Sequence, residues 1–304
     1  MNKYFLTEKC DKPIVLALGF FDCVHLGHKI LIDETVALAK QLSAESAIFT
    51  FASDPNEFLG KQPQIYTIKE RESVFANLKL QNLIFSHFDK EFSSMSGSQF
   101  LDILTASFNI KAIVVGHDYT YGKNAECKTT DLQTYMKNKS IQVKIVPFEK
   151  YNGEKISTSS LKKLVVEGKI SILNTLITEP YFLINKVVAA HQRGTILGFP
   201  TANLCVHHNC LKLGTGVYAT KVTVDGNVYD AMTNVGAKLT FGDMDYSIES
   251  YIFDFSDNIY GKEIRLQFYM KLRDVVNFGS SSELQKQLKI DSQNTRNYFA
   301  TICN

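Results

Sequence analysis

One change of pattern near the middle of the chain constrains the fold more than any other feature. Up to about Lys169, short β-rich runs alternate with segments that carry the apolar spacing of helices. From about Tyr181 onwards, β-rich runs follow one another almost without helical segments. A chain of 304 residues also lies near the upper limit for a single hydrophobic core. We therefore expect two domains of different class, over residues 1–175 and 181–304.

The first half has the alternation of an α/β domain. An apolar run at 14–18 ends at Gly19, and the next segment, 29–42, places its leucines on one helical face. Such alternation predicts a parallel sheet covered by helices, with ligands bound at the carboxyl ends of the strands. Further strands are expected at 47–51, 83–85, 112–115 and 141–146, and helices at 68–80, 98–108 and 130–138.

The second half has the pattern of a small antiparallel β-barrel. Asp225-Gly226 predicts a tight hairpin turn between two β-rich runs, and Ser280 with Glu283 fits a capping box that begins a terminal helix. Several antiparallel strands followed by one helix predict a small barrel with that helix against it. Strands are expected at 182–189, 217–224, 228–233, 248–255 and 263–270.

Charge and hydropathy exclude several classes of partner. The net charge of +2 is too small to indicate nucleic-acid or membrane binding. The N-terminus lacks the pattern of a signal peptide, and no run reaches the roughly 18 consecutive apolar residues that span a bilayer. We expect a cytoplasmic protein with small-molecule substrates, without nucleic-acid or membrane partners, that is a monomer or a weak oligomer.

The six cysteines are scattered, and in a reducing compartment they are expected to be free thiols. One segment groups possible metal ligands, namely Cys205, His207, His208 and Cys210. A zinc site there is an alternative to a plain surface loop. We favour the loop, because no second ligand pair has the spacing of a zinc finger and a closed site needs four placed ligands.

A glycine- and histidine-containing segment follows the first long predicted strand. Residues 19–28 read GFFDCVHLGH, in which His25 and His28 face the same way on a first helical turn. Gly27 lets a ligand approach the backbone closely, and the helix N-terminus adds partial positive charge and free amide groups. A single histidine is usually structural, but this arrangement predicts a phosphate site whose imidazoles stabilise charge that develops during phosphoryl chemistry.

The pattern His25-x-Gly27-His28 resembles the HxGH motif of the nucleotidylyltransferases. With Phe21-Asp22 before it, the segment resembles the FAD synthetase module of the bifunctional bacterial riboflavin kinase/FAD synthetase family. The segments VVGHDYTYG at 114–122 and ISTSSLK at 156–162 fit the same module. The resemblance implies a Rossmann-like nucleotidylyltransferase domain, catalytic roles for His25 and His28, and ATP or FMN binding by Gly19, Phe20, Asp22, Gly27, Asp118, Ser157, Thr158 and Ser159.

The three hydroxyls at 157–159 have a second interpretation. They stand at the expected start of a helix, where they suit ATP phosphates but serve equally well as simple helix caps.

This half also departs from the family pattern. Cys23 replaces a glycine, Phe20 replaces an asparagine, and Asp54 replaces a histidine that precedes a proline. Lys162 stands where the family has arginine, and a lysine cannot reproduce the bidentate grip of a guanidinium on phosphate. Asp54 is expected to place negative charge near the nucleotide. These changes predict weaker or altered adenylylation.

The segment LGFPTANL at 197–204 resembles the PTAN motif of riboflavin kinases. Its Thr201 hydroxyl and Asn203 carbonyl are hard oxygen ligands suited to Mg²⁺ that bridges ATP phosphates. The resemblance implies transfer of the ATP γ-phosphoryl group to the 5′-hydroxyl of riboflavin, with Glu249 as catalytic base. Without it, Glu249 would be taken for a solvent-facing strand residue. ATP or flavin binding is implied for Gly198, Thr201, Asn203, Tyr218 and Arg273, and metal binding for Thr201 and Asn203.

The second half departs from its family pattern before the PTAN segment. Asn185, Ala190 and Thr195 occupy positions where Gly, Gly and Arg are expected, and each added side chain crowds a backbone-lined phosphate pocket. Another change gives KLTF at 238–241 in place of an RPTF segment. These changes predict reduced nucleotide affinity but leave Thr201, Asn203 and Glu249 in place.

The resemblance runs from about Leu16 to Asp291, with the motifs of both modules in order. The leading hypothesis is a transferase that makes FMN from riboflavin and ATP, then FAD from FMN and a second ATP with release of pyrophosphate. One alternative keeps a single activity. Another is a protein that binds flavin or nucleotide for regulation or storage. The retained histidines and Glu249 argue against it, because pure binding does not need a base.

Overall fold

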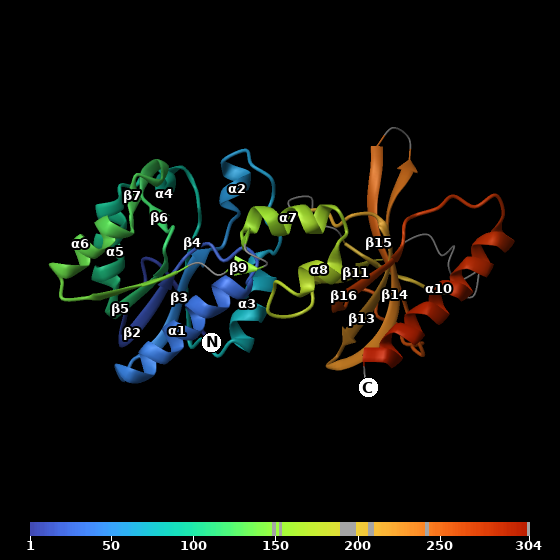
Figure 1. Cartoon of the computed structure of the whole chain (residues 1–304), viewed down its shortest axis with the longest axis horizontal. Helices are drawn as coiled ribbons and strands as arrows, with labels where there is room; N and C mark the ends of the chain where they lie inside the picture. The colour runs from blue at the N-terminus through green and yellow to red at the C-terminus, as the bar shows by residue number, and fades with distance from the viewer. Residues whose placement is uncertain (148–149, 152–153, 189–198, 206–209, 241–242, 303–304) are drawn as a thin grey trace. The chain divides into compact units, whose positions relative to one another are not determined.

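The structure is a computed structural model that describes residues 1–147, 150–151, 154–188, 199–205, 210–240 and 243–302. The chain divides into two compact units, Met1–Thr158 and Ser159–Asn304. Each unit has its own sheet (Figure 1). Each also has its own set of buried apolar side chains. No helix in the described ranges is long and apolar enough to cross a membrane.

The first unit is built on a six-stranded parallel sheet in the order β1-β4-β3-β2-β5-β8. Strands β3 and β4 lie on one side of β2, and β5 and β8 lie on the other side, so the strand order reverses between β2 and β5. Ligands of such sheets bind at this point of reversal, outside the carboxyl ends of the strands. The strands are β1 (Asn2–Phe5), β2 (Cys10–Leu18), β3 (Glu45–Phe51), β4 (Asn82–Ser86), β5 (Phe108–Gly116) and β8 (Gln142–Val146).

Helices cover this sheet, as the alternating pattern predicts. Helix α1 (Leu26–Gln41) packs against β2, β3 and β5, and the last five residues of β2 are fully buried because the sheet is covered on both faces. The other helices are α2 (Pro55–Phe58), α3 (Ile68–Asn77), α4 (Lys90–Ser94), α5 (Gly97–Ser107) and α6 (Thr129–Lys137). Smaller elements are the 3₁₀ turn η1 (Lys123–Ala125) and the short hairpins β6 (Thr120–Tyr121) with β7 (Cys127–Lys128), and β9 (Lys150–Tyr151) with β10 (Glu154–Lys155).

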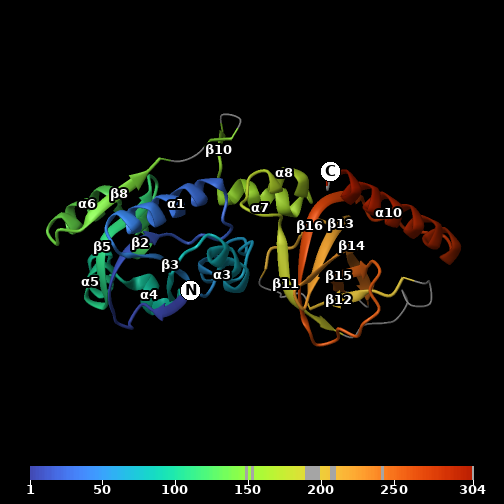
Figure 2. The same cartoon turned by 90° about the horizontal axis from the view of Figure 1, so that it is seen from below.

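The second unit contains a closed antiparallel barrel in the order β11-β12-β15-β14-β13-β16 (Figure 2). Asp225 and Gly226 both have positive φ, 47° and 84°, as the predicted hairpin turn requires. Ser280 accepts a hydrogen bond from the Glu283 N–H and so caps α10 (Ser281–Ile302), which packs on β13, β14 and β16. The strands are β11 (Phe182–Val188), β12 (Ala202–Leu204), β13 (Gly216–Val224), β14 (Asn227–Thr240), β15 (Asp243–Ile252) and β16 (Glu263–Arg273).

The fold class is therefore confirmed: a parallel α/β domain is followed by an antiparallel barrel with a terminal helix. The division between the units lies at 158/159, before the change of pattern at 169–181. Two helices lie between these points, α7 (Thr158–Val166) and α8 (Ile170–Asn174), and all of their residues except Thr158 are grouped with the barrel. Asn174 donates to the Phe268 carbonyl on β16, and the Gly214 N–H donates to the Val165 carbonyl.

Candidate functional site

A cavity of about 970 Å³ opens at the carboxyl ends of the parallel strands in the first unit. Gly19 follows β2, Phe51 ends β3 and Gly116 ends β5, and all three line it. The cavity thus lies at the point where the strand order reverses, as the fold class predicts. Four of the predicted site residues, Gly19, Phe20, His28 and Asp118, share its lining.

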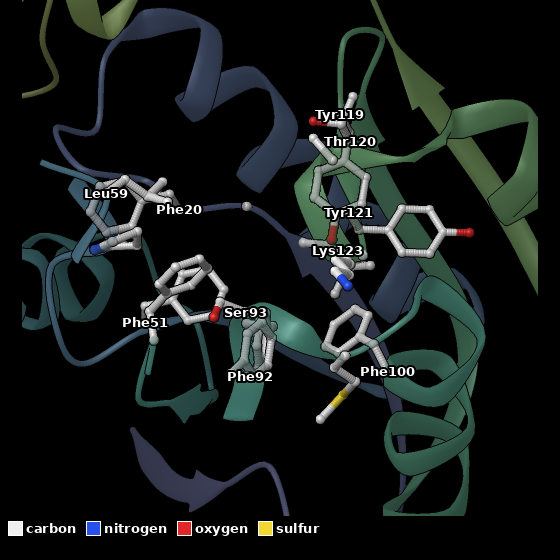
Figure 3. Close-up of a pocket in the computed structure, with 18 of the residues that line it drawn as sticks. Phe20, Phe51, Leu59, Phe92, Ser93, Phe100, Tyr119, Thr120, Tyr121 and Lys123 are labelled. Carbon is white, nitrogen blue, oxygen red and sulfur yellow. The ribbon is translucent and has the colours of Figure 1, made fainter. Parts of the chain in front are cut away.

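Aromatic rings form much of the cavity wall. Figure 3 shows Phe20 and Phe51 on one side of the space, and Phe100 and Tyr121 on the other. The Phe51 ring lies 4.9 Å from Phe92 and 5.1 Å from Phe88, centroid to centroid. Apart from Phe20, the sequence alone did not single these rings out, because they come from separate segments. Flat aromatic walls of this kind suit a planar, conjugated ligand.

The turn that carries Gly19 is tightly built. A side chain at Gly19 would place its Cβ 2.8 Å from the Phe21 ring, so any larger residue would require this buried ring to move. Phe21 itself has a positive φ of 51°, which is strained for a bulky residue. Its ring packs edge-on against His28, with centroids 5.0 Å apart. The conformation of this turn therefore places the Phe21 ring against His28.

His25 and His28 face one another at the start of α1, with their rings stacked at 3.7 Å. The Nδ1 of His25 accepts a hydrogen bond from the His28 backbone N–H at 3.2 Å, so the proton of a neutral His25 ring is on Nε2. The Nδ1 of His28 lies 3.0 Å from the Cys23 carbonyl oxygen, which can only accept, so Nδ1 carries the proton there. The neutral pair therefore combines an N–H on His25 Nε2 with a lone pair on His28 Nε2.

Burial lowers the pKa of His28 to about 4, against smaller raising effects from the Cys23 carbonyl and Asp118. His28 is therefore neutral at pH 7 before a ligand binds. A phosphate group brought beside it would favour the protonated form, because opposite charge raises the pKa of an imidazole.

Asp22 and Asp54 point their carboxylates at backbone rather than into the cavity. Asp22 is buried and accepts from the Ile65 and Tyr66 N–H groups at 2.7 and 3.2 Å. Asp54 is also buried; it caps α2 through the Asn56 N–H at 2.9 Å and accepts from the Gln64 N–H at 2.8 Å. Neither residue is part of the cavity lining. The charge of Asp54 is thus stabilised by these backbone donors.

Cationic side chains border the cavity. Lys61, Lys90 and Lys123 line it and are exposed, whereas Asp118 is an acidic lining residue. Within the described residues none of these three lysines forms an ion pair. The edge of the cavity is therefore positively charged, which suits a polyanionic ligand.

Four further predicted residues of the first half are not among the residues that line the cavity. Gly27 is in the first turn of α1, and Ser157 directly precedes α7, which begins at Thr158. Ser159 belongs to the second unit. Among the described residues, none of these four lines the cavity.

In the barrel, strand pairing brings the kinase-type residues together. Glu249 on β15 is directly opposite Asn203 on β12 and, on its other side, Asn234 on β14. Residues directly opposite in neighbouring strands project from the same face of the sheet. Thr201 precedes Asn203 by two residues, and the Asn203 amide N–H donates to the Thr201 carbonyl at 3.4 Å. Phe199 anchors this segment by packing against Tyr251, with ring centroids 5.0 Å apart.

Tyr218 and Arg273 have partners within the protein. Tyr218 is fully buried, and its hydroxyl donates to the Gly214 carbonyl at 2.5 Å; burial raises its pKa. Arg273 binds both carboxylate oxygens of buried Asp291, at 2.7 to 3.0 Å, and joins β16 to α10. The structure therefore places Tyr218 in the barrel core and Arg273 in an ion pair.

Some predicted features lie outside the described residues, namely Gly198, Ala190, Thr195, His207 and His208. Asn185, which stands where a glycine is expected, is buried on β11. The cysteines of the described ranges are free thiols. Within those ranges, no cluster of three histidine, cysteine or acidic side chains could hold a metal ion.

Two family models match the chain, one over each unit. The model described as FAD synthetase matches residues 7–160, which include the cavity and the histidine pair. The model described as riboflavin kinase matches residues 177–299, which include the barrel and Glu249.

The chain is similar over nearly its whole length to curated proteins named bifunctional riboflavin kinase/FMN adenylyltransferase. The protein from Listeria monocytogenes is 35% identical over 300 residues, covering 97% of this chain and 95% of the relative. The protein from Bacillus subtilis is 32% identical over 308 residues, covering 99% and 97%. A crystal structure named as a macrolide-efflux protein from Streptococcus pneumoniae has a TM-score of 0.88 at 28% identity, covering 98% of this chain and 99% of that chain.

Proposed function

The chain belongs to the bifunctional riboflavin kinase/FMN adenylyltransferase family, and from that premise we propose that FMN is adenylylated at the N-terminal cavity and riboflavin is phosphorylated at the barrel. The chain is accordingly a transferase that makes FMN from riboflavin and ATP, and FAD from FMN and ATP. The assignment of one reaction to each unit rests on the two family models, each of which covers one of the two sites. The separate cores of the two units support it.

At the N-terminal cavity, the aromatic wall would hold the flavin ring and the turn at Gly19 with the start of α1 would hold the ATP phosphates. An FMN phosphate oxygen attacks the α-phosphorus of ATP, a new P–O bond forms, and pyrophosphate leaves. In this role, His25 offers its Nε2–H to a phosphate oxygen. His28 takes up a proton from solvent on Nε2 when the ATP phosphates bind beside it, and both rings then stabilise the negative charge of the pyrophosphate leaving group. The opposite tautomers of the two rings support these roles.

At the barrel, Glu249 would act as the base that takes the proton of the riboflavin 5′-hydroxyl as it attacks the ATP γ-phosphorus. Its neighbours across the sheet, Asn203 and Asn234, would hold substrate or phosphate oxygens beside it. Tyr218 and Arg273 would support the site from the core and from α10 rather than by contact with ligand.

The oxygens near Glu249 fit a Mg²⁺ ion. The Asn203 amide nitrogen is turned to the Thr201 carbonyl, which leaves the amide oxygen available, and the Thr201 hydroxyl lies on the same segment. Such neutral, hard oxygens, completed by ATP phosphates and water, are the ligands that Mg²⁺ prefers. Bound there, the ion would neutralise charge on the transferred phosphoryl group. We also propose that the protein works in the cytoplasm, as a monomer or a weak oligomer.

One assay tests this division. Purified protein is incubated with riboflavin, ATP and Mg²⁺, and flavins are resolved by chromatography; in parallel, FMN replaces riboflavin. Successive appearance of FMN and FAD is expected. If FMN forms from riboflavin but no FAD forms, only the barrel is active. If FAD forms only when FMN is supplied, only the N-terminal cavity is active. Tight flavin binding without any product would contradict both enzymatic roles.

A further inference from the structure

Arg71 is a fully buried arginine that contacts two residues of the N-terminal cavity wall, Phe20 and Phe51, without lining the cavity itself. It belongs to α3, in a run of charged residues, Lys69 to Glu72, that would suit an exposed helix face. Instead it is 0% exposed and is among the largest fully buried side chains of the described protein. Burial lowers its pKa to about 10, so it remains charged at neutral pH.

The guanidinium joins the ends of two neighbouring strands. Its Nη1 donates to the Phe20 carbonyl at 3.0 Å and to the Thr50 hydroxyl at 2.7 Å, and its Nη2 donates to the Phe51 carbonyl at 2.6 Å. The Thr50 hydroxyl in turn donates to the Phe20 carbonyl at 2.5 Å. Phe20 follows β2, whereas Thr50 and Phe51 end β3. Arg71 thus ties together two strand ends at the edge where the cavity opens.

The same guanidinium also supports the side chain of Phe20. Its central carbon lies 4.9 Å from the centre of the Phe20 ring, close enough for a cation–π contact. Phe20 and Phe51 both face the cavity (Figure 3). Arg71 therefore contacts both the backbone and the ring of Phe20 while it is itself fully buried and outside the cavity lining.

The cost of this arrangement points to a role beyond packing. The guanidinium donates to neutral carbonyl and hydroxyl oxygens, and the nearby carboxylates of Asp22 and Asp54 offset its burial only in part, because its pKa is still lowered. Apolar side chains of similar volume usually stabilise a core as well as a buried charge or better. What the guanidinium provides is a fixed position of the Phe20 backbone. The next residue, Phe21, is held at a positive φ and covers His28, so a shift of Phe20 would move both.

We propose that Arg71 is a positioning residue of the adenylylating site, which holds the turn at Phe20 and the end of β3 so that His28 and the cavity wall are correctly placed. The inference rests on the proposed function of the N-terminal cavity. Arg71 touches no reacting group in this scheme and acts through Phe20 and Phe21.

The test compares Arg71→Met and Arg71→Lys with a control at the opposite end of the same sheet. Asn82 is also buried and begins β4, where it bonds Asn2, Glu45 and Ser46, so Asn82→Leu removes comparable buried hydrogen bonds without touching the cavity. FMN-to-FAD turnover is measured at a temperature where circular dichroism shows each variant folded. Riboflavin phosphorylation by the same protein serves as an internal control.

Arg71→Met is expected to lower kcat for FAD formation roughly 100-fold, the loss that follows from about 1 Å of misplacement. The KM for FMN should change several-fold at most, and riboflavin phosphorylation should be unchanged. Arg71→Lys should give an intermediate kcat, because one ammonium group can bond one of the two carbonyls. Asn82→Leu should lower the unfolding temperature but leave kcat per folded molecule within about threefold of the wild type.

A second measurement, on the His28 ring, reports the conformation of the turn at Phe20 and Phe21. The ¹⁵N spectrum of the His28 ring at pH 6 should show a neutral ring in the wild type, with His28→Gln used for assignment. In Arg71→Met, loosening of Phe21 should expose the ring, and its pKa should rise toward 6.5, so a partly protonated ring is expected. The other groups near His28 are the His25 ring, the Cys23 carbonyl and Asp118, and none of them is altered.

A kcat for Arg71→Met within threefold of the wild type, or a His28 ring that stays neutral at pH 6, would overturn the proposal. If Arg71→Met does not fold, the same two measurements are made on Thr50→Val, which removes one donor to the Phe20 carbonyl and one acceptor of Arg71 but leaves the direct bond of Arg71 to Phe20. A smaller fall in kcat than for Arg71→Met is then expected, and a kcat equal to that of the wild type, with a neutral His28 ring, would overturn the proposal. If the wild type makes no FAD from FMN, the proposed function fails, and the His28 spectrum still decides whether Arg71 sets the turn.

Discussion

At the scale of single residues, chemistry depends on small differences in surroundings. Glu249 sits in a row of polar side chains on one face of the barrel sheet, between two asparagines. His28 is held neutral by burial, although it belongs to a site expected to bind phosphates. Substitution of each residue is therefore expected to affect only the reaction of its own domain.

Glu249→Gln and His28→Ala should have opposite effects on the two reactions. Glutamine keeps the size of glutamate but cannot accept a proton, so FMN formation should fall by about 100-fold or more while FMN-to-FAD conversion persists. His28→Ala should abolish FAD formation and leave FMN formation intact. Both rates can be followed by chromatography of the flavins. Loss of both activities in either variant, with its fold preserved, would show that the two reactions are not divided as proposed.

His28 should also make stability depend on acidity. The pKa of a histidine is about 6.5 in an unfolded chain, whereas burial lowers that of His28 to about 4 in the folded protein. Between these values the unfolded state binds a proton that the folded state does not, so stability is lost as the pH falls from 6.5 toward 4. Thermal unfolding at pH 7 and pH 5 should show a smaller acid-induced loss for His28→Gln than for the wild type. Equal losses in the two proteins would mean that burial of His28 does not contribute.

At the scale of elements, strand register places Glu249, and a chain of buried hydroxyls crosses the strands beside it. The Thr220 hydroxyl on β13 lies 3.0 Å from the Ala231 carbonyl and 2.7 Å from the Thr233 hydroxyl on β14. Thr233 in turn lies 2.7 Å from the Ser250 hydroxyl on β15. All three side chains are fully buried. Because Ser250 follows Glu249, this chain fixes the register that turns Glu249 to the opposite face.

Thr233→Val tests the contribution of this hydroxyl chain. Valine keeps the volume of threonine but removes the middle hydroxyl, so the Ser250 hydroxyl loses its partner in the core. The free energy of unfolding of the barrel should fall by about 1–3 kcal/mol, measured by denaturant titration. Thr223→Val, at a half-buried position on β13, is the matched control and should change stability by less than about 0.5 kcal/mol. Equal effects of the two substitutions would show that the hydroxyl chain is not a specific stabiliser.

Most long elements could be predicted from sequence, because their apolar spacing reflects which face is buried. The expected strand at 14–18 and helix at 68–80 correspond to the end of β2 and to α3. Strand β12 has only three residues, too few to show an alternation. The aromatic wall could not be predicted, since its rings meet only after distant segments fold together. Arg71 was missed because a charged residue in a charged run normally faces solvent.

At the scale of the whole molecule, the two family matches leave residues 161–176 between them, and this segment contains most of α7 and all of α8. By sequence pattern the barrel domain begins near Tyr181. By contact it begins at Ser159, because both helices are grouped with the barrel. The side chains of Val165, Ile170 and Leu173 are fully buried. The segment therefore has the features of a structural part of the kinase domain rather than of a flexible linker.

Two fragments test which of these boundaries, Ser159 or Tyr181, begins a segment that folds on its own. A fragment of residues 159–304 should unfold cooperatively, whereas one of residues 181–304 should be largely unfolded. Loss of three buried aliphatic side chains costs on the order of 5 kcal/mol, which is comparable with the total stability of a small domain. The shorter fragment also loses the bonds of Asn174 to the Phe268 carbonyl and to the Tyr181 N–H, at 2.9 Å each. Circular dichroism melting of both fragments makes the comparison, with riboflavin phosphorylation as a functional check. Equal melting temperatures would show that the barrel folds without α7 and α8, and that the boundary lies where the sequence pattern changes.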